Sequence, residues 1–285
     1  MQKYDVLWQV GTDHAGIATQ LVVERKLEGE GKTRESLGRS KFEKEIWKWK
    51  KYSGNTITKQ LRRLGSSVDW SSEKFTMDAD FSDAVSEVFC KLYDEGLIYK
   101  GYRLVNWDPS LQTALSDLEV SNEEESSFIW NIKYEHDSGH LTVATTRPET
   151  LLGDMAVAVN PKDKRYKKLI GKTVKLPLTD REIPVIADDY VDMSFGTGCL
   201  KVTPAHDFND FEIGKRHKLE FLNILNKDGT LNENAPKKYQ NLKMLEARKI
   251  IIEDLDQANL LAGSEKHKLA IPRGERTGEI LEPYL

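Results

Sequence analysis

The stretch HLTVATTRPETLLGDMAVAVN, residues 140–160, decides the fold of the larger part of this 285-residue chain. It holds two short apolar runs, LTVA and AVAV, separated by a polar turn that contains proline and glycine. Short runs rich in β-branched residues and bounded by turn residues are typical of strands. Similar runs occur before and after it: LIYKGYRLVNW, SFIWNIKY, KTVKLPL, EIPVIA and CLKVTP. So many short strands predict a closed or strongly curved sheet, a β-barrel-like domain with peripheral helices.

The residues that precede this region follow another pattern. YDVLWQV, residues 4–10, reads as a short buried strand that leads through a turn at Gly11-Thr12-Asp13 into a helix. SSVDWSSEKFTMD, residues 66–78, reads as a polar connector. The chain as a whole is therefore predicted to be α/β, with an incomplete Rossmann-type piece that exposes apolar surface. Helical periodicity is found at 38–64, 81–95, 207–217 and 243–261.

Changes in composition predict the domain limits. The pattern changes between residues 108 and 120, after NWDPS, and changes back near Pro272. We therefore expect a partial Rossmann-type region with connector helices at 1–118. The β-barrel-like domain would occupy 119–272, inserted in that region, and 273–285 would return towards it.

Composition limits the possible classes of protein. The net charge of −4 argues against a surface built for indiscriminate nucleic-acid binding. No apolar run approaches the ~20 residues that cross a bilayer, so we expect a cytoplasmic protein without a membrane partner. Cys90 and Cys199 fit neither a disulfide framework nor a zinc site, and we expect both to be buried. Local basic clusters lie at Lys48, Lys50 and Lys51, at Lys59, Arg62 and Arg63, and at Lys215, Arg216 and Lys218.

Three polar segments are candidates for chemistry. In GTDHAGIATQ, residues 11–20, Asp13 follows a strand end, where α/β folds place ligand groups. It either binds an ammonium or ribose hydroxyl, or caps the following helix, and the sequence favours neither. In TTRPET, residues 145–150, hydroxyls and a fixed cation at a strand end suit a polar ligand with a carboxylate, ester or phosphate. A turn held by threonine side chains is the alternative.

The third segment is FGTGCLKVTPAHDFNDFEIG, residues 195–214. Lys201 and Thr203 alternate on one face of a strand, and Asp207 and Asp210 share the first turn of a helix. The positive end of the helix is expected to lower the pKa of both carboxyls and keep them ionised. His206, Asp207 and Asp210 could also be metal ligands, but the spacing matches no zinc pattern, so we expect no metal.

These segments together resemble valyl-tRNA synthetases. The similarity runs through GTDHAGIATQ, TITKQLRRLGSSVDW, NWDPSLQTALSDLEV, TTRPETLLGDMAVAVNP, IPVIADDYVD, FGTGCLKVTPAHDFNDFEIG and RGERTGEILEPYL, in the order of that family. The chain departs from the family pattern at Val10, Met155, Cys199 and Leu200, none of which is a polar group of the candidate site. Neither the HIGH-type nor the KMSKS-type motif of class I synthetases is present, so the site that uses ATP is expected to be incomplete.

The resemblance implies that residues 119–272 form an editing domain, which hydrolyses threonyl-tRNA(Val) by water attack on the aminoacyl ester. It assigns catalysis to Thr145, Lys201, Thr203, Asp207 and Asp210, and substrate binding to Thr146, Arg147, Phe195, His206 and Asp13. Asp210 would bind the substrate ammonium, and Arg147 and Lys201 would lie near the terminal adenosine and its phosphate. Thr145 or Thr203, with Asp207, would recognise the threonine hydroxyl.

The implied partner is tRNA(Val), with its aminoacylated 3′ end and a threonine or valine moiety, together with the rest of a synthetase. Editing is expected to need no cofactor, whereas the full-length enzyme would use ATP and Mg²⁺. Two alternatives stay open. One is a ligase in its own right, and the other is a tRNA-binding module without hydrolytic activity.

Overall fold

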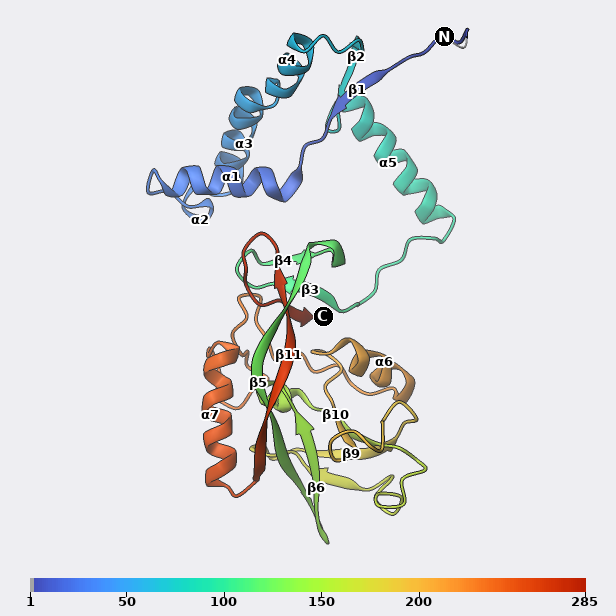
Figure 1. Cartoon of the computed structure of the whole chain (residues 1–285), viewed down its shortest axis with the longest axis vertical. Coiled ribbons are helices and arrows are strands. Elements are labelled where there is room, and N and C mark those ends of the chain that lie inside the picture. The colour runs from blue at the N-terminus through green and yellow to red at the C-terminus, as the bar shows by residue number, and fades with distance from the viewer. Residues whose placement is uncertain (1–2) are drawn as a thin grey trace. The chain divides into compact units, whose positions relative to one another are not determined.

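The computed structural model describes residues 3–285, and the chain divides into two compact units, Met1–Lys100 and Gly101–Leu285 (Figure 1). The domain limits predicted from the sequence, at 118 and 272, stay a prediction.

The first unit is a small α/β piece. Strand β1 (Gln9–Thr12) pairs in parallel with β2 (Asp69–Phe75), and helices lie between them in sequence. These helices are α1 (Gly16–Glu28), α2 (Arg34–Leu37), α3 (Arg39–Ser53) and α4 (Thr56–Arg63), and α5 (Ala79–Asp94) follows β2. A small core forms where Val23 and Leu27 of α1 pack with Phe42 of α3.

Three predictions for this unit were wrong. The strand begins at Gln9, and Val6, Leu7 and Trp8 are exposed, because a two-stranded sheet offers nothing to cover them. Residues 69–75 of the expected connector form β2, whose backbone pairs with β1 despite its polar side chains. Cys90 is exposed because α5 has no buried residue among those described, whereas Cys199 is buried as predicted.

The second unit contains three sheets. β11 (Leu261–Gly274), β5 (Val120–His136) and β6 (Gly139–Thr145) form an antiparallel sheet in that order. The second sheet has the order β10 (Cys199–Val202), β7 (Ala156–Val159), β9 (Glu182–Ala187) and β8 (Thr173–Lys175). The third joins β12 (Glu282–Tyr284), β3 (Val105–Asp108) and β4 (Thr113–Leu115).

The β-rich character of this unit is confirmed, but the barrel is not. At one edge of the second sheet β10 contacts β6, and at the other edge of that sheet β8 contacts β5, the central strand of the first sheet. No hydrogen-bonded ladder joins them at either edge in residues 3–285, and none of the sheets closes. The expected strand LIYKGYRLVNW is shorter too, since β3 begins only at Val105.

The helices of the second unit lie where the sequence predicts them. α6 (Phe208–His217) follows β10, and α7 (Met244–Gln257) precedes β11, with short 3₁₀ turns at Asp117–Glu119 and Pro148–Gly153. In Figure 1, α7 runs beside the crossed ribbons of β5 and β11. Its buried side chains Ala247, Ile251 and Leu255 recur every four residues, so α7 presents one apolar stripe to the core.

This stripe yields a matched pair of variants on one helix. Leu255 is 0% exposed and Leu245 is 50% exposed. Leu255→Ala should destabilise the second unit by about 2–5 kcal/mol, because it leaves a cavity in the core. Leu245→Ala should cost less than ~1 kcal/mol. Urea unfolding, followed by hydrogen exchange in α7, measures the free energy of unfolding of both variants. Equal losses of stability would show that Leu255 does not pack in the core as described.

Candidate functional site

The site forms where β10 ends and α6 begins. Pro204 closes the strand, and Asp207 then caps the helix, its Oδ1 accepting hydrogen bonds from the backbone of Asn209 (2.8 Å) and Asp210 (3.0 Å). This satisfies two of the amides that a helix start leaves unpaired. The cap fixes the first turn of α6 against the end of β10, so both aspartates are held at one place.

Lys201 is the centre of the buried polar network. Its Nζ donates to Thr150 Oγ1 (2.8 Å), Thr203 Oγ1 (2.5 Å) and Asp154 Oδ1 (3.2 Å). An ammonium has three donors, and these contacts use all of them. Lys201 is 7% exposed. As it lies, it has no donor left for a phosphate.

Asp154 pairs with Lys201 and was missed in the sequence. It is fully buried, accepts from the hydroxyls of Thr203 (2.5 Å) and Tyr134 (2.7 Å), and so joins β5 to β10. Burial raises the pKa of the Asp154 carboxyl, and the Lys201 ammonium opposes that shift. The available signal was a carboxylate two residues before the apolar strand AVAV, because a carboxylate that is buried there needs a partner.

Asp210 differs from the expectation for a helix-start carboxylate. It is 6% exposed, and its Oδ2 accepts the backbone N–H of Thr203 at 2.8 Å. Burial raises the pKa of Asp210 to about 7, with a further contribution from the Asp207 carboxylate. The predicted lowering of its pKa is therefore wrong, because desolvation outweighs the helix dipole. No donor among residues 3–285 contacts Oδ1, which stays available.

The TTRPET turn joins this network from the other side. Thr145 Oγ1 accepts the Arg147 amide at 3.1 Å, and the Thr145 hydroxyl hydrogen finds no acceptor in the described chain. The Thr150 hydroxyl donates to the Arg147 carbonyl at 3.0 Å while its oxygen accepts from Lys201. One chain of hydrogen bonds thus runs from Arg147 through Lys201 to Asp210.

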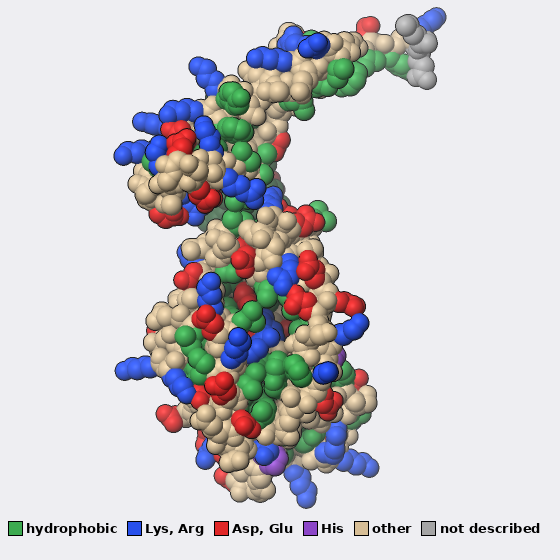
Figure 2. Space-filling view, turned by 60° about the vertical axis from the view of Figure 1, so that its left-hand side comes forward, with side chains coloured by type: hydrophobic (Ala, Val, Ile, Leu, Met, Phe, Trp, Pro, Cys, Tyr) green, Lys and Arg blue, Asp and Glu red, His purple; other side chains and the backbone are tan. Residues whose placement is uncertain are grey.

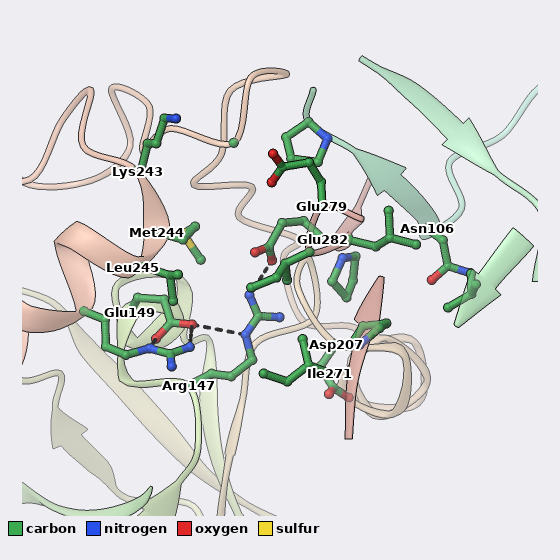
Figure 3. A pocket seen from close by; sticks show the side chains of 18 of the residues that line it. Asn106, Arg147, Glu149, Asp207, Lys243, Met244, Leu245, Ile271, Glu279 and Glu282 are labelled. Carbon is green, nitrogen blue, oxygen red and sulfur yellow. Dashed lines mark hydrogen bonds and ion pairs between the residues drawn. The ribbon is translucent and has the colours of Figure 1, made fainter. Parts of the chain in front are cut away.

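The guanidinium of Arg147 is fixed by two glutamates, as Figure 3 shows. It pairs with Glu282 of β12 and with Glu149 at 3.2 Å, and Glu149 pairs in turn with Arg248 of α7 at 2.7 Å. The two glutamates are buried, and each arginine offsets their charge. Glu149, Glu282 and Arg248 were not predicted. The Arg248–Glu149 and Arg147–Glu282 pairs join residues 99 and 135 positions apart, and such pairing leaves no local pattern.

A cavity of about 1000 Å³ opens beside this ion-pair chain. Three of the predicted site residues, Thr146, Arg147 and Asp207, line it (Figure 3). Asp207 uses Oδ1 for the helix cap, which leaves Oδ2 without a donor in the described residues. No hydrogen bond engages the Thr146 side chain within residues 3–285. Both groups can therefore receive a ligand.

His206 supports the site as a neutral side chain. It is buried, and its Nε2 accepts the Ile224 amide at 3.0 Å. Burial lowers the pKa of His206 to about 3, and the nearby cations of Arg147 and Lys201 act in the same direction. A neutral imidazole that accepts at Nε2 carries its proton on Nδ1.

Two predicted residues are not part of this hydrogen-bond network. Phe195 is 66% exposed and does not line the cavity, although Gly196 places its loop against Ala144 at the end of β6. Asp13 belongs to the first unit, where its Oδ2 accepts the Ala15 amide at 2.9 Å and its Oδ1 accepts the Thr76 hydroxyl at 3.2 Å. Asp13 thus orders the turn before α1.

Two general features complete the description of the chain. Among residues 3–285, no group of three or more His, Cys, Asp or Glu side chains is placed to hold a metal ion. No helix in that range is long and apolar enough to span a membrane.

Residues 1–268 match the model of one protein family, described as tRNA synthetases class I (I, L, M and V). The chain belongs to this family. It is 63% identical to a valine–tRNA ligase of Legionella pneumophila (strain Lens) over 98% of its own length and 30% of that protein. It is 59% identical to a valine–tRNA ligase of Dechloromonas aromatica (strain RCB), with 100% of the chain and 30% of that protein covered.

The resemblance predicted from the sequence is therefore confirmed, and the chain spans about 30% of the length of these relatives. A solved ternary complex of LeuRS, tRNA and LeuAMS from Agrobacterium radiobacter K84 aligns with 94% of this chain and 45% of that chain. The TM-score of this alignment is 0.38, and the sequence identity is 16%.

The raised pKa of Asp210 predicts how stability depends on pH. A carboxyl whose folded pKa is about 7 against an ordinary 3.8 binds its proton more tightly when folded. This stabilising effect is complete below the unfolded pKa, shrinks as pH rises from there towards 7, and is gone above it. Asp210→Asn removes that dependence but keeps an acceptor for the Thr203 amide. Relative to this variant, the free energy of unfolding of the wild type should fall by on the order of 2 kcal/mol between about pH 5 and about pH 8.

Denaturant unfolding followed by hydrogen exchange in β10 and α6 measures this difference. Glu212→Gln is the matched control, because Glu212 lies on the same helix with a side chain that is 57% exposed. The difference in free energy of unfolding between Glu212→Gln and the wild type should stay nearly constant with pH. If Asp210→Asn behaves in the same way, Asp210 does not titrate near neutrality.

Proposed function

We propose that this chain contains an editing site that hydrolyses threonyl-tRNA(Val). The observation that carries the proposal is the free Oδ1 of the buried Asp210 side chain, whose other oxygen, Oδ2, accepts the Thr203 amide at 2.8 Å. A carboxylate in this position can pair with the ammonium of an aminoacyl ester. Family membership supports an aminoacyl-tRNA as the ligand.

Discrimination between threonine and valine would rest on polar groups with unused capacity. The hydroxyl hydrogen of Thr145, the hydroxyl of Thr146 and Oδ2 of Asp207 have no partner among residues 3–285. Threonine can satisfy such groups through its own hydroxyl, whereas valine leaves them desolvated and unpaired. In this proposal Thr203 is a positioning residue, because Asp154 already accepts its hydroxyl hydrogen.

Lys201 also becomes a positioning residue, and its earlier assignment beside a phosphate is replaced. Arg147 faces the cavity with its guanidinium fixed between Glu149 and Glu282, so it would present an oriented edge to the terminal adenosine. Water would attack the ester carbonyl, and the bond to the ribose oxygen would break as that oxygen takes up a proton. Thr203 donates its hydroxyl hydrogen to the Asp154 carboxylate, but both residues are buried and neither lines the cavity, so no covalent step is proposed.

For the protein as a whole, we propose the reaction named in its relatives, attachment of valine to its tRNA in the cytoplasm. ATP and Mg²⁺ would serve that reaction, and Asp13 would face the ammonium of valine. The alternative for this chain is a tRNA-binding module without hydrolytic activity.

The decisive measurement is deacylation of threonyl-tRNA(Val) by the purified chain. We expect faster hydrolysis than without protein, and little acceleration for valyl-tRNA(Val). Asp210→Asn should reduce the rate roughly 30-fold or more, because ~2 kcal/mol or more of charge pairing is lost. The Thr203 amide keeps its acceptor in this variant, so the fold should survive.

Glu212→Gln, which removes an exposed carboxylate from the same helix, should leave the rate unchanged. A wild-type rate in folded Asp210→Asn would remove Asp210 from the site. A wild-type chain that binds tRNA(Val) without hydrolysing its ester would favour the binding module.

A further inference from the structure

The helices α3 and α4 carry an unusual concentration of positive charge. Residues 39–63 contain nine basic side chains and two glutamates, in a chain whose net charge is −4. The rest of the chain is therefore clearly acidic. Such an asymmetry marks a region suited to an anionic partner. The basic residues are Arg39, Lys41, Lys44, Lys48, Lys50, Lys51, Lys59, Arg62 and Arg63.

On α3 the lysines form a stripe. Lys41, Lys44, Lys48 and Lys51 recur at intervals of three or four residues, which places them on one helix face. All four are exposed. The opposite side holds Phe42, Ile46 and Trp49, which pack into the core of the first unit. The stripe therefore points away from that core along roughly 15 Å of helix.

Most of these charges are not neutralised within the chain. Lys48 pairs with Glu45 at 2.5 Å, whereas Lys41, Lys44 and Lys51 have no carboxylate within 4.0 Å in the described residues. On α4, Lys59 and Arg63 are likewise exposed and without such a partner among residues 3–285. Figure 2 shows Lys and Arg side chains along the outer edge of the first unit.

We propose that the lysine stripe of α3, formed by Lys41, Lys44, Lys48 and Lys51, binds the phosphate backbone of duplex tRNA. Three of these four ammonium groups have no carboxylate partner among residues 3–285. Such a row on one helix face can follow several phosphates of one strand, and it gains free energy by releasing their counterions. The stripe lies in the first unit, far in sequence from the editing residues. The proposal therefore rests on the charge pattern and on family membership, and it holds whether or not the chain hydrolyses threonyl-tRNA(Val).

The test uses the full chain and uncharged tRNA, so editing does not enter. Neutralising three lysines together, Lys41→Gln, Lys44→Gln and Lys51→Gln, should weaken binding of all tRNA species alike. The plot of log affinity against log salt concentration should become less steep. The magnitude of its slope should decrease by about 2–3, because three phosphate contacts are lost and each contributes about 0.9. The control neutralises Lys164, Lys167 and Lys168, which are exposed in the second unit and have no carboxylate partner within the described residues.

Fluorescence anisotropy with labelled tRNA and an acceptor-stem minihelix gives both slopes. Thermal unfolding verifies that the exposed substitutions leave stability within about 0.5 kcal/mol. An unchanged slope in the α3 variant, or an equal fall in the control, would overturn the proposal. So would tight binding to anionic lipid vesicles combined with a normal tRNA slope, since the stripe would then serve a membrane surface.

Discussion

Lys201 and Asp154 lie 3.2 Å apart in the interior of the second unit, and the arrangement of the site depends on this pair. Two isolated charges would be costly there, because burial removes their hydration. The hydroxyls of Tyr134, Thr150 and Thr203 replace the lost water. Tyr134 comes from β5, Thr150 from the TTRPET turn and Thr203 from the position directly after β10, so satisfying one ion pair fixes three segments relative to one another.

The strand and helix positions were predictable where local pattern decides them. Apolar runs gave β6, β7, β9 and β10, and Asp207 before an apolar-periodic segment gave the start of α6. β2 was missed because its sequence, DWSSEKF, is polar and its pairing with β1 joins residues about 60 positions apart. Closure of the sheets also depends on pairing between distant residues. The alternation of apolar and polar residues indicates where strands lie but not how the edges of the sheets meet.

In this chain the sequence predicts which residues belong to the site better than it predicts what each of them does. The sequence brought Lys201, Thr203, Asp207 and Asp210 into one segment, and the structure keeps them together. Their roles depend on which donors and acceptors are already used, and that depends on Asp154 and Thr150, about 50 residues earlier. A lysine with three partners and a lysine with none look alike in sequence. The first orders a site, whereas the second can bind an anion.

The raised pKa of Asp210 also bears on how a cationic ligand would bind. With a pKa of about 7, the empty site holds a mixture of protonated and ionised carboxyls near neutral pH. An ammonium beside Oδ1 favours the ionised form, so the molecules in which Asp210 is protonated release that proton when the cation binds. Part of the pairing energy is then used to ionise the carboxyl, which weakens binding below neutrality. Burial that makes the charge costly when the site is empty also makes its pairing stronger when the cation arrives, because both effects come from the low local dielectric.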